Sequence, residues 1–249
     1  MGKSWAASSL FLCLLTGSLA SAEVTEHLVS RMEELSVGVH SYKAAYDLTL
    51  QMEKGPIRMK GLLLYKWPAS LRNEMSVDGP LGLHQMIYWR EGILWQYLPA
   101  SKVAFRQEEA KLREQFPQLF ASQELLNLRS PFEMAQPHSI QLIREEPAEG
   151  GEGYYLFEAV PKKAIQSQGV LSPQLCRFRI SSQDGLLRDF LMYNAHGQEI
   201  YAQHFWDIQI NLELLDEEFQ FHLPDDVEVV DVTKKSKERL EAMAKGASL

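Results

Sequence analysis

The sequence feature that most constrains the fold is the stretch 41–52, where two kinds of side chain alternate. One set is apolar or aromatic, namely Tyr42, Ala44, Tyr46, Leu48, Leu50 and Met52. The other is mostly polar, namely Ser41, Lys43, Ala45, Asp47, Thr49 and Gln51. Successive side chains of a strand point to opposite faces, so this period of two predicts a β-strand with one buried face. Lys54-Gly55-Pro56 is a turn signal, after which the chain is expected to return as a second strand.

Further strand-like stretches follow at short spacing, and they are residues 70–77, 84–89, 93–99, 102–106, 139–144, 154–161, 174–181, 186–194, 198–211 and 219–224. Helices are expected only at 23–38, where apolar residues recur at helical spacing, and as short pieces within 107–136. Strands that do not alternate with helices indicate an α+β fold. We therefore predict a large curved antiparallel sheet of about 11–12 strands, wrapped over an N-terminal helix and short central helices.

The first residues have the layout of an export signal. Lys3 gives a positive start, residues 5–15 form an apolar stretch too short to cross a bilayer comfortably, and Ala20-Ser21-Ala22 matches a cleavage site. Cleavage after Ala22 would yield an exported protein, and a retained membrane anchor is the alternative. The predicted organisation is a signal peptide at 1–22, one domain at 23–233 and a charged tail at 234–249.

Composition argues against two classes of function. The net charge of -8, without a basic stripe, argues against a nucleic-acid partner. Signatures of a serine nucleophile elbow, a paired-cysteine motif or a metal-binding histidine pair do not occur in the sequence. Cys176, the one cysteine left after cleavage, alternates with arginines and is expected to be a buried apolar residue, with a catalytic thiol as the alternative. We expect no enzymatic activity, no cofactor and no metal.

The order of the elements resembles the periplasmic outer-membrane lipoprotein carriers, the LolA-like proteins. That family shows a glycine, alternating apolar residues and a basic-Pro element, and then a turn glycine before Leu-Trp-x-Tyr-x-Pro. The matching residues are Gly61, Leu63, Tyr65, Lys66 and Pro68, then Gly92, Leu94, Trp95, Tyr97 and Pro99. The closing strands also resemble the family, so that the likeness covers nearly all of residues 24–232. It implies an unclosed half-barrel with an apolar cavity for acyl chains.

The resemblance also implies which side chains line that cavity. The implied lining is Tyr46, Leu48, Leu50, Leu63, Tyr65, Trp67, Met75, Trp95, Tyr97, Phe178 and Ile180. The side chains expected to point the other way are Lys43, Asp47, Lys60, Lys66, Gln96 and Arg177. An ordinary packed core is the alternative for each lining residue, because apolar strand faces usually just pack.

Trp67 departs from the family pattern. In well-studied carriers an arginine stands immediately before the motif proline and helps to latch a helical lid. Tryptophan has a single N–H and cannot offer a forked set of donors, so this latch role does not carry over. We expect Trp67 at the cavity rim, in contact with an N-terminal or central helix.

The function that the resemblance implies is a periplasmic carrier that shelters acyl chains of lipoproteins or lipids for transport towards the outer membrane. The implied partners are those acyl chains, an inner-membrane donor and an outer-membrane acceptor, and a monomer is expected. A lipid- or misfolded-protein-sensing regulatory module of the cell envelope is the first alternative. An exported hydrolase is the second.

Overall fold

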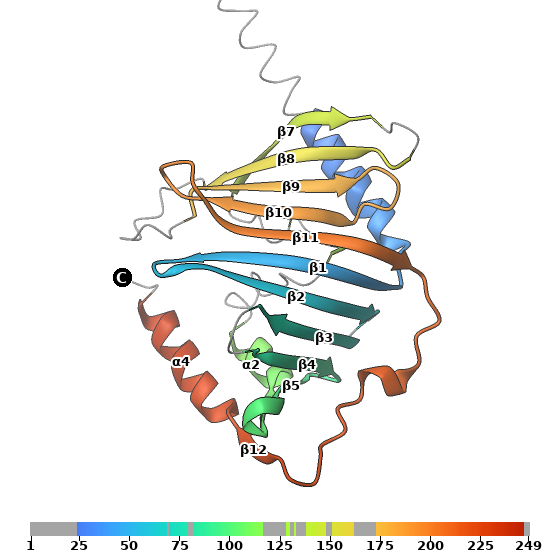
Figure 1. The fold of residues 1–249 in the computed structure, drawn as a ribbon. Coiled ribbons are helices and arrows are strands. Elements are labelled where there is room, and N and C mark those ends of the chain that lie inside the picture. The colour runs from blue at the N-terminus through green and yellow to red at the C-terminus, as the bar shows by residue number, and fades with distance from the viewer. Residues whose placement is uncertain are drawn as a thin grey trace, which may run out of the picture.

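Twelve strands form one sheet in the computed structural model of the chain (Figure 1). The structure describes residues 24–68, 70–78, 82–116, 128–129, 132, 138–147, 151–161 and 173–246. The predicted signal peptide, its cleavage site and most of the predicted central helices therefore lie outside the described residues. In chain order the strands are β1 (Ser41–Met52), β2 (Gly55–Lys66), β3 (Ser70–Val77), β4 (His84–Arg90), β5 (Ile93–Leu98), β6 (Val103–Glu108), β7 (His138–Glu146), β8 (Tyr154–Pro161), β9 (Leu175–Ser181), β10 (Leu187–Tyr193), β11 (Glu199–Ile210) and β12 (Glu228–Asp231).

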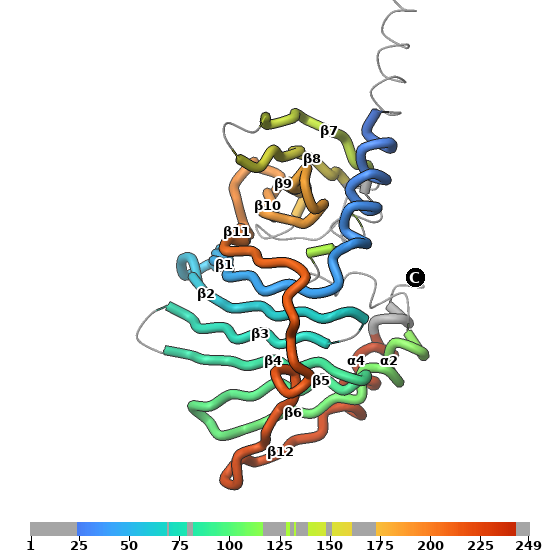
Figure 2. The backbone as a smooth tube through the Cα atoms, turned by 90° about the vertical axis from the view of Figure 1, so that its right-hand side faces the viewer, coloured from blue at the N-terminus to red at the C-terminus, as the bar shows by residue number. Residues whose placement is uncertain are grey.

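Strand β1 stands at the centre of the sheet. It pairs with β2 on one side and with β11 on the other, so that the full order is β12-β6-β5-β4-β3-β2-β1-β11-β10-β9-β8-β7. All neighbouring strands are antiparallel except β12, which runs parallel to β6. The order has two ends, and the β7–β11 half curls (Figure 2), so the sheet is an unclosed half-barrel. The predicted α+β fold class is confirmed.

The N-terminal helix, residues 24–37, covers one face of the sheet (Figures 1 and 2). It buries Leu28 and Met32 in the same apolar core as Tyr42 of β1 and Phe178 of β9. The close approach depends on Gly185, between β9 and β10. A Cβ atom there would lie 2.2 Å from the Met32 carbonyl oxygen, and its φ of +70° also favours glycine.

Two more helices lie near the β6 edge of the sheet. Helix α2 (Glu109–Gln115) follows β6 directly, as predicted, and α4 (Thr233–Gly246) lies within the charged C-terminal segment. Their buried side chains Leu112 and Leu240 pack together. Among the described residues, no helix has the length and apolar character needed to cross a membrane.

One predicted strand is wrong. Residues 219–224 are not a strand, because they continue from the short helix η2 (Asp216–Phe219) as extended chain without strand pairing, and the last strand is β12. Strands β2 to β5 each already pair on both sides. A segment that crosses them therefore contacts them through side chains, and Phe219 packs in this way against Leu64.

Candidate functional site

The strand register sorts the side chains onto two faces, because directly paired residues point to the same side. We call the face that carries Tyr46 and packs against the N-terminal helix the inner face, and the opposite face the outer face. Tyr46 pairs with Gly61 of β2 and Phe205 of β11, and Gly61 pairs with Met75 of β3. The predicted lining residues that share the inner face are Tyr46, Leu48, Leu50, Leu63, Tyr65, Met75, Phe178 and Ile180.

Trp95 and Tyr97 lie on the outer face, which corrects their predicted place in the cavity. Trp95 pairs with Tyr88 of β4, and the same row of paired residues continues through β3 to Leu64 of β2. Leu64 follows Leu63 in the strand and therefore points to the outer face. Gln96, which was expected to point outward, consequently lies on the inner face. The other residues expected outward do lie there, namely Lys43, Asp47, Lys60, Lys66 and Arg177.

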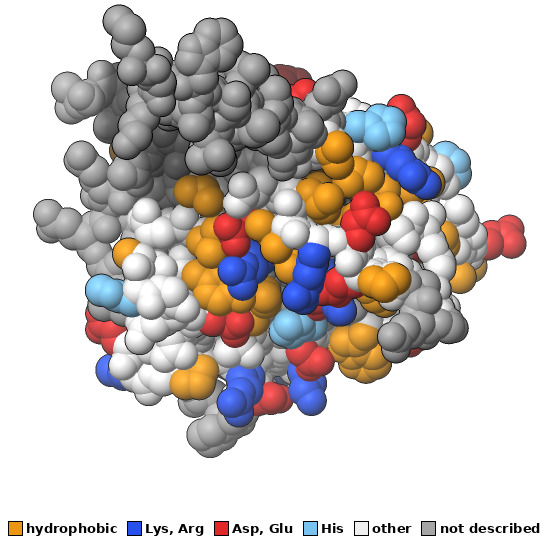
Figure 3. All heavy atoms as spheres, turned by 90° about the horizontal axis from the view of Figure 1, so that it is seen from above, with side chains coloured by type: hydrophobic (Ala, Val, Ile, Leu, Met, Phe, Trp, Pro, Cys, Tyr) orange, Lys and Arg blue, Asp and Glu red, His pale blue; other side chains and the backbone are white. Residues whose placement is uncertain are grey.

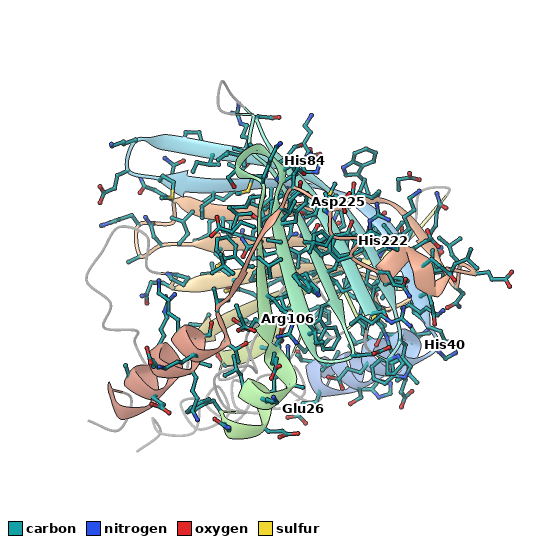
Figure 4. All side chains as sticks on the ribbon, turned by 90° about the horizontal axis from the view of Figure 1, so that it is seen from below. Glu26, His40, His84, Arg106, His222 and Asp225 are labelled. Atoms are coloured by element: carbon teal, nitrogen blue, oxygen red, sulfur yellow. The ribbon has the colours of Figure 1, made fainter. Side chains whose placement is uncertain are left out.

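These aromatic residues belong outside because the chain itself covers the outer face. Residues 212–221, which we call the strap, cross strands β2 to β5, and Figure 4 shows the segment with His222 and Asp225 passing over the sheet. Phe221 of the strap lies against Tyr88, Trp95 and Tyr97, with ring centroids 5.2 to 5.5 Å apart. In strands β2 to β5, the apolar character of a residue therefore does not indicate that its side chain points to the inner face.

Ion pairs hold the start of the strap in place. Lys66 Nζ lies 2.6 Å from Asp216 Oδ1, and Arg90 Nη2 lies 3.2 Å from the second carboxylate oxygen. The hydrogen bond from Lys66, with the charges of Lys66 and Arg90, lowers the pKa of Asp216. Beside the strap lies a pocket of about 290 Å³, whose lining includes Tyr88, Trp95 and Phe221.

Beneath the N-terminal helix, the inner face is a packed core. Five predicted lining residues belong to this core, each at most 5% exposed: Tyr46, Leu63, Tyr65, Phe178 and Ile180. Two described residues of the segment 107–136, which we call the central segment, also contact this core. The Leu128 N–H donates to the Tyr42 hydroxyl at 3.2 Å, and Phe132 packs edge-on against Phe157. In this half, the ordinary-core interpretation fits the observed contacts.

Beyond Tyr46, towards the β1–β2 turn, the inner face stays apolar but is only half-buried. We call this region the open end, and it comprises Leu48, Leu50, Met59, Met75, Met192 and Tyr201. Ile57, which pairs with Leu50, is 36% exposed. Methionine is unbranched and polarizable, so three of them give this surface a shape that adapts to flexible apolar groups.

Tyr46 marks the boundary between the two halves. Its ring, 1% exposed, lies over Gly61, where a Cβ atom would come within 2.2 Å of the ring carbon Cζ. The missing side chain at position 61 lets the hydroxyl reach Asn73 and donate to its Oδ1 at 2.9 Å. Burial raises the pKa of Tyr46, against the opposing effect of this hydrogen bond, so the hydroxyl is neutral at physiological pH.

A second polar pair lies next to the open end. The Tyr201 hydroxyl donates to Gln203 Oε1 at 2.7 Å. Burial, followed by the influence of Tyr46, raises the pKa of Tyr201. The Gln203 side chain is 0% exposed, and its Nε2 has no hydrogen-bond partner among the described residues. The inner face therefore holds a polar group within its apolar surface.

Trp67 lies at the other end of β2 and does not line the open end. Its ring is 54% exposed, and the Arg129 guanidinium sits 4.5 Å above the ring centroid. Arg129 also donates through Nε to the Ser36 carbonyl at 3.0 Å, and the backbone N–H of Trp67 donates to the His40 carbonyl at 2.8 Å. An arginine thus does contact the N-terminal helix, but it is Arg129 of the central segment and not a residue at position 67.

This contact predicts the effect of substitutions at Trp67. Trp67→Ala should lower the free energy of unfolding by about 1 kcal/mol, the usual size of a partly exposed cation–π contact. Trp67→Arg should cost more, because it places a second guanidinium beside Arg129. Trp206 is a matched control, since it is equally exposed but donates to the Asp47 carboxylate at 3.1 Å. Urea titrations in which Trp67→Arg is no worse than Trp206→Arg would contradict this prediction.

The outer face of β7 to β11 carries balanced charges. Figure 3 shows acidic and basic side chains beside one another among apolar ones. A pocket of about 380 Å³ here includes Arg144, Arg177 and Arg179, and these pair with Glu146, Glu158 and Asp189 respectively. Because each guanidinium already has a carboxylate, this pocket gives no net attraction for an anion. Among the described residues, no cluster of histidine, cysteine or acidic side chains suits a metal.

Cys176 is buried on the inner face, 7% exposed, and burial raises its pKa to about 11. The thiol is therefore protonated, and we predict that it stays unreactive in the folded chain. At about pH 8, the chain lacking residues 1–22 should react with a thiol reagent only after denaturant is added. Ser101→Cys places an exposed thiol for comparison and should react at once. Equal rates for the two thiols would show that Cys176 is accessible.

Among solved structures, an uncharacterized conserved protein from Thermus thermophilus aligns with a TM-score of 0.53 and 14% sequence identity, over 83% of this chain and 98% of that one. At this identity the likeness establishes the fold alone. The unclosed sheet with a helix on its inner face is the architecture expected from the sequence. The chain therefore shares the fold of that protein, and the unclosed half-barrel predicted from the sequence is confirmed.

Two further solved structures align with TM-scores below 0.5. A putative outer membrane lipoprotein-sorting protein domain from Vibrio parahaemolyticus aligns with a TM-score of 0.38 and 12% identity, over 80% of this chain and 97% of that one. MucB, in the Pseudomonas aeruginosa MucA/MucB complex, aligns with a TM-score of 0.44 and 14% identity, over 78% of this chain and 59% of that one. Neither score supports an inference about function. No protein family and no curated protein matches the sequence.

Several residues of the site were missed at the sequence level, namely Met59, Asn73, Met192, Tyr201 and Gln203. The signal for Gln203 was present, because it alternates in step with Tyr201 and Phe205 and so shares their face. A polar residue in such a pattern is ordinarily assigned to the solvent side. Gln203 is buried because β11 pairs with both β1 and β10. This pairing cannot be read from the sequence.

Proposed function

We propose that the chain binds acyl chains of lipids or lipoproteins at its open end and carries them through the periplasm towards the outer membrane. The observation that supports this is a continuous apolar inner face that is fully buried at one end and only half-buried at the other. Each CH2 group that moves from water onto such a surface gains about 0.8 kcal/mol. Leu48, Leu50 and Met75, predicted from the sequence, provide part of it.

We propose a binding role rather than catalysis. Sheltering an acyl chain requires apolar surface and a way to release it, but no reactive group. The thiol of Cys176 lies on the inner face and is held protonated by burial, so it is unsuited to act as a nucleophile for an exported hydrolase. The proposed carrier needs no cofactor.

Export is part of this proposal. Removal of residues 1–22 would leave a chain that starts at Glu23, one residue before the described N-terminal helix. The binding domain would extend to residue 233, and the predicted tail contributes helix α4, which packs on α2. N-terminal sequencing of the protein from osmotic-shock fluid should find Glu23, and finding Met1 would overturn the assignment.

A lipid-transfer assay tests the carrier role. Fluorescent acyl lipid should move from donor to acceptor vesicles faster when the purified chain is present, and the rate should rise with its concentration. Transfer needs binding that is reversible as well as tight. Binding without transfer would overturn the carrier and favour a sensor.

One observation favours the regulatory alternative. The pocket of about 290 Å³ beside the strap exposes aromatic surface on the outer face, away from the proposed lipid, and aromatic side chains are common at protein interfaces. A regulatory module should hold one inner-membrane partner stably, whereas a carrier should release its donor and acceptor. Co-purification from envelope extracts separates these two behaviours.

A further inference from the structure

Gln203 is a buried polar residue of the inner face whose side chain makes only some of its possible hydrogen bonds. It is 0% exposed, and it pairs with Leu48 of β1 and Phe190 of β10, both on the inner face. Its Oε1 accepts from the Tyr201 hydroxyl, whereas its Nε2 has no partner among the described residues. Most buried amide donors in folded proteins are hydrogen-bonded, so this one needs an explanation.

The neighbouring hydroxyl groups are already engaged. Tyr46 donates to Asn73 and Tyr201 donates to Gln203, whereas Gln203 Nε2 is a buried donor without a partner among the described residues. Among the described residues, the side chains at the paired inner-face positions around Gln203 are uncharged. The inner-face residues at the paired positions of β1, β2, β10 and β11 are Tyr46, Leu48, Leu50, Ile57, Met59, Gly61, Phe190, Met192, Tyr201 and Phe205.

The proposed ligand must therefore accept a hydrogen bond without carrying a charge. A carboxylate buried among these side chains would be costly, because no cation stands at the paired positions to compensate it. A plain hydrocarbon would leave the Gln203 N–H unsatisfied. An ester carbonyl fits, since it accepts hydrogen bonds, is neutral and is attached to an acyl chain that suits the adjoining open end.

We propose that Gln203 Nε2 donates to the carbonyl oxygen of an ester-linked acyl chain and thereby fixes how deep the chain lies. This inference rests on the proposed acyl-chain binding. It assigns to the site a preference for esterified acyl chains over free fatty acids and over hydrocarbons without a carbonyl.

Three fluorescent probes test the assignment, namely methyl parinarate as the ester, parinaric acid as the carboxylate and diphenylhexatriene as the carbonyl-free ligand. The wild-type chain should bind the ester more tightly than the acid. Gln203→Met should weaken ester binding by about 3- to 10-fold, the range expected for one neutral hydrogen bond, and should change diphenylhexatriene binding by less than about twofold.

Two control variants isolate the anchoring donor. Gln209→Met changes an exposed outer-face glutamine on the same strand and should change neither affinity. Tyr201→Phe removes the hydroxyl bonded to Gln203 but keeps the Nε2 donor, so it should preserve the preference for the ester. If Tyr201→Phe abolishes that preference as fully as Gln203→Met does, the effect is structural and the assignment is overturned.

The remaining outcomes separate this inference from the proposed function. If wild type binds neither diphenylhexatriene nor the ester, the proposed function fails and the inference fails with it. If wild type binds both probes, and Gln203→Met reduces the two affinities equally or changes neither of them, only the proposed hydrogen bond from Gln203 is overturned. The same conclusion follows if wild type binds the acid as tightly as the ester. If Gln203→Met does not fold, the infrared stretching frequency of the ester carbonyl bound to the wild-type chain provides the test. A shift to lower frequency on binding supports the hydrogen bond from Gln203, and an unshifted band overturns it.

Discussion

Met75→Asp should abolish the binding of apolar probes to the folded chain. Met75 lies half-buried on the inner face at the open end, where a bound acyl chain would cover it. Covering a lone carboxylate with hydrocarbon costs several kcal/mol, so affinity should fall by about 100-fold or more. Titration with diphenylhexatriene measures the effect, and circular dichroism confirms that the variant is folded.

The neighbouring residue provides the matched control for this substitution. Ser76 is next to Met75 on β3 but is exposed and points to the outer face. Ser76→Asp adds the same charge to the same strand and should leave probe affinity unchanged. If both variants lose binding equally, or if Met75→Asp binds as wild type does, the open end is not the acyl-chain site.

Gly61→Ala should give a large loss of stability for the addition of a single methyl group. The new Cβ atom would meet the Tyr46 ring at 2.2 Å, and this ring is buried and tied to Asn73. Relief requires the ring to move and the buried hydrogen bond to break. Overpacking together with that loss should lower the free energy of unfolding by about 3 kcal/mol, measured by urea denaturation.

A double-mutant cycle shows whether Tyr46 causes this effect. In a Tyr46→Leu background, the ring is absent and Gly61→Ala should cost much less than in wild type. Gly151→Ala is the negative control, since a Cβ atom there meets nothing within 4 Å. If the cost of Gly61→Ala is unchanged in the Tyr46→Leu background, close packing of the ring is not the reason for glycine at this position.

The elements that the sequence predicted well are those with local signals. The alternation in residues 41–52 determines the buried face of β1, and the turn glycines separate the strands that follow. The antiparallel sheet and the N-terminal helix could therefore be predicted before any tertiary contact was known.

The errors concern which side of the sheet a residue faces and what covers it. Trp95 and Tyr97 look like cavity residues because they are aromatic, but their register with Tyr88 places them outside, under Phe221. Residues 219–224 look like a strand because Phe219, Phe221 and Leu223 alternate with Gln220 and His222. Phe219 and Phe221 instead cover the outer face. Both errors arise from the strap, because its long-range contacts with the outer face cannot be recognised from local alternation.

Native mass spectrometry of the exported chain, purified without detergent, tests the central claim most directly. The claim is that the open end holds an acyl chain, so the spectrum should show the mature polypeptide together with an adduct of lipid mass. The adduct should disappear on delipidation, return when esterified lipid is added, and be absent from the Met75→Asp variant. A spectrum with only the bare polypeptide mass, unchanged when lipid is added to the folded protein, would contradict acyl-chain binding.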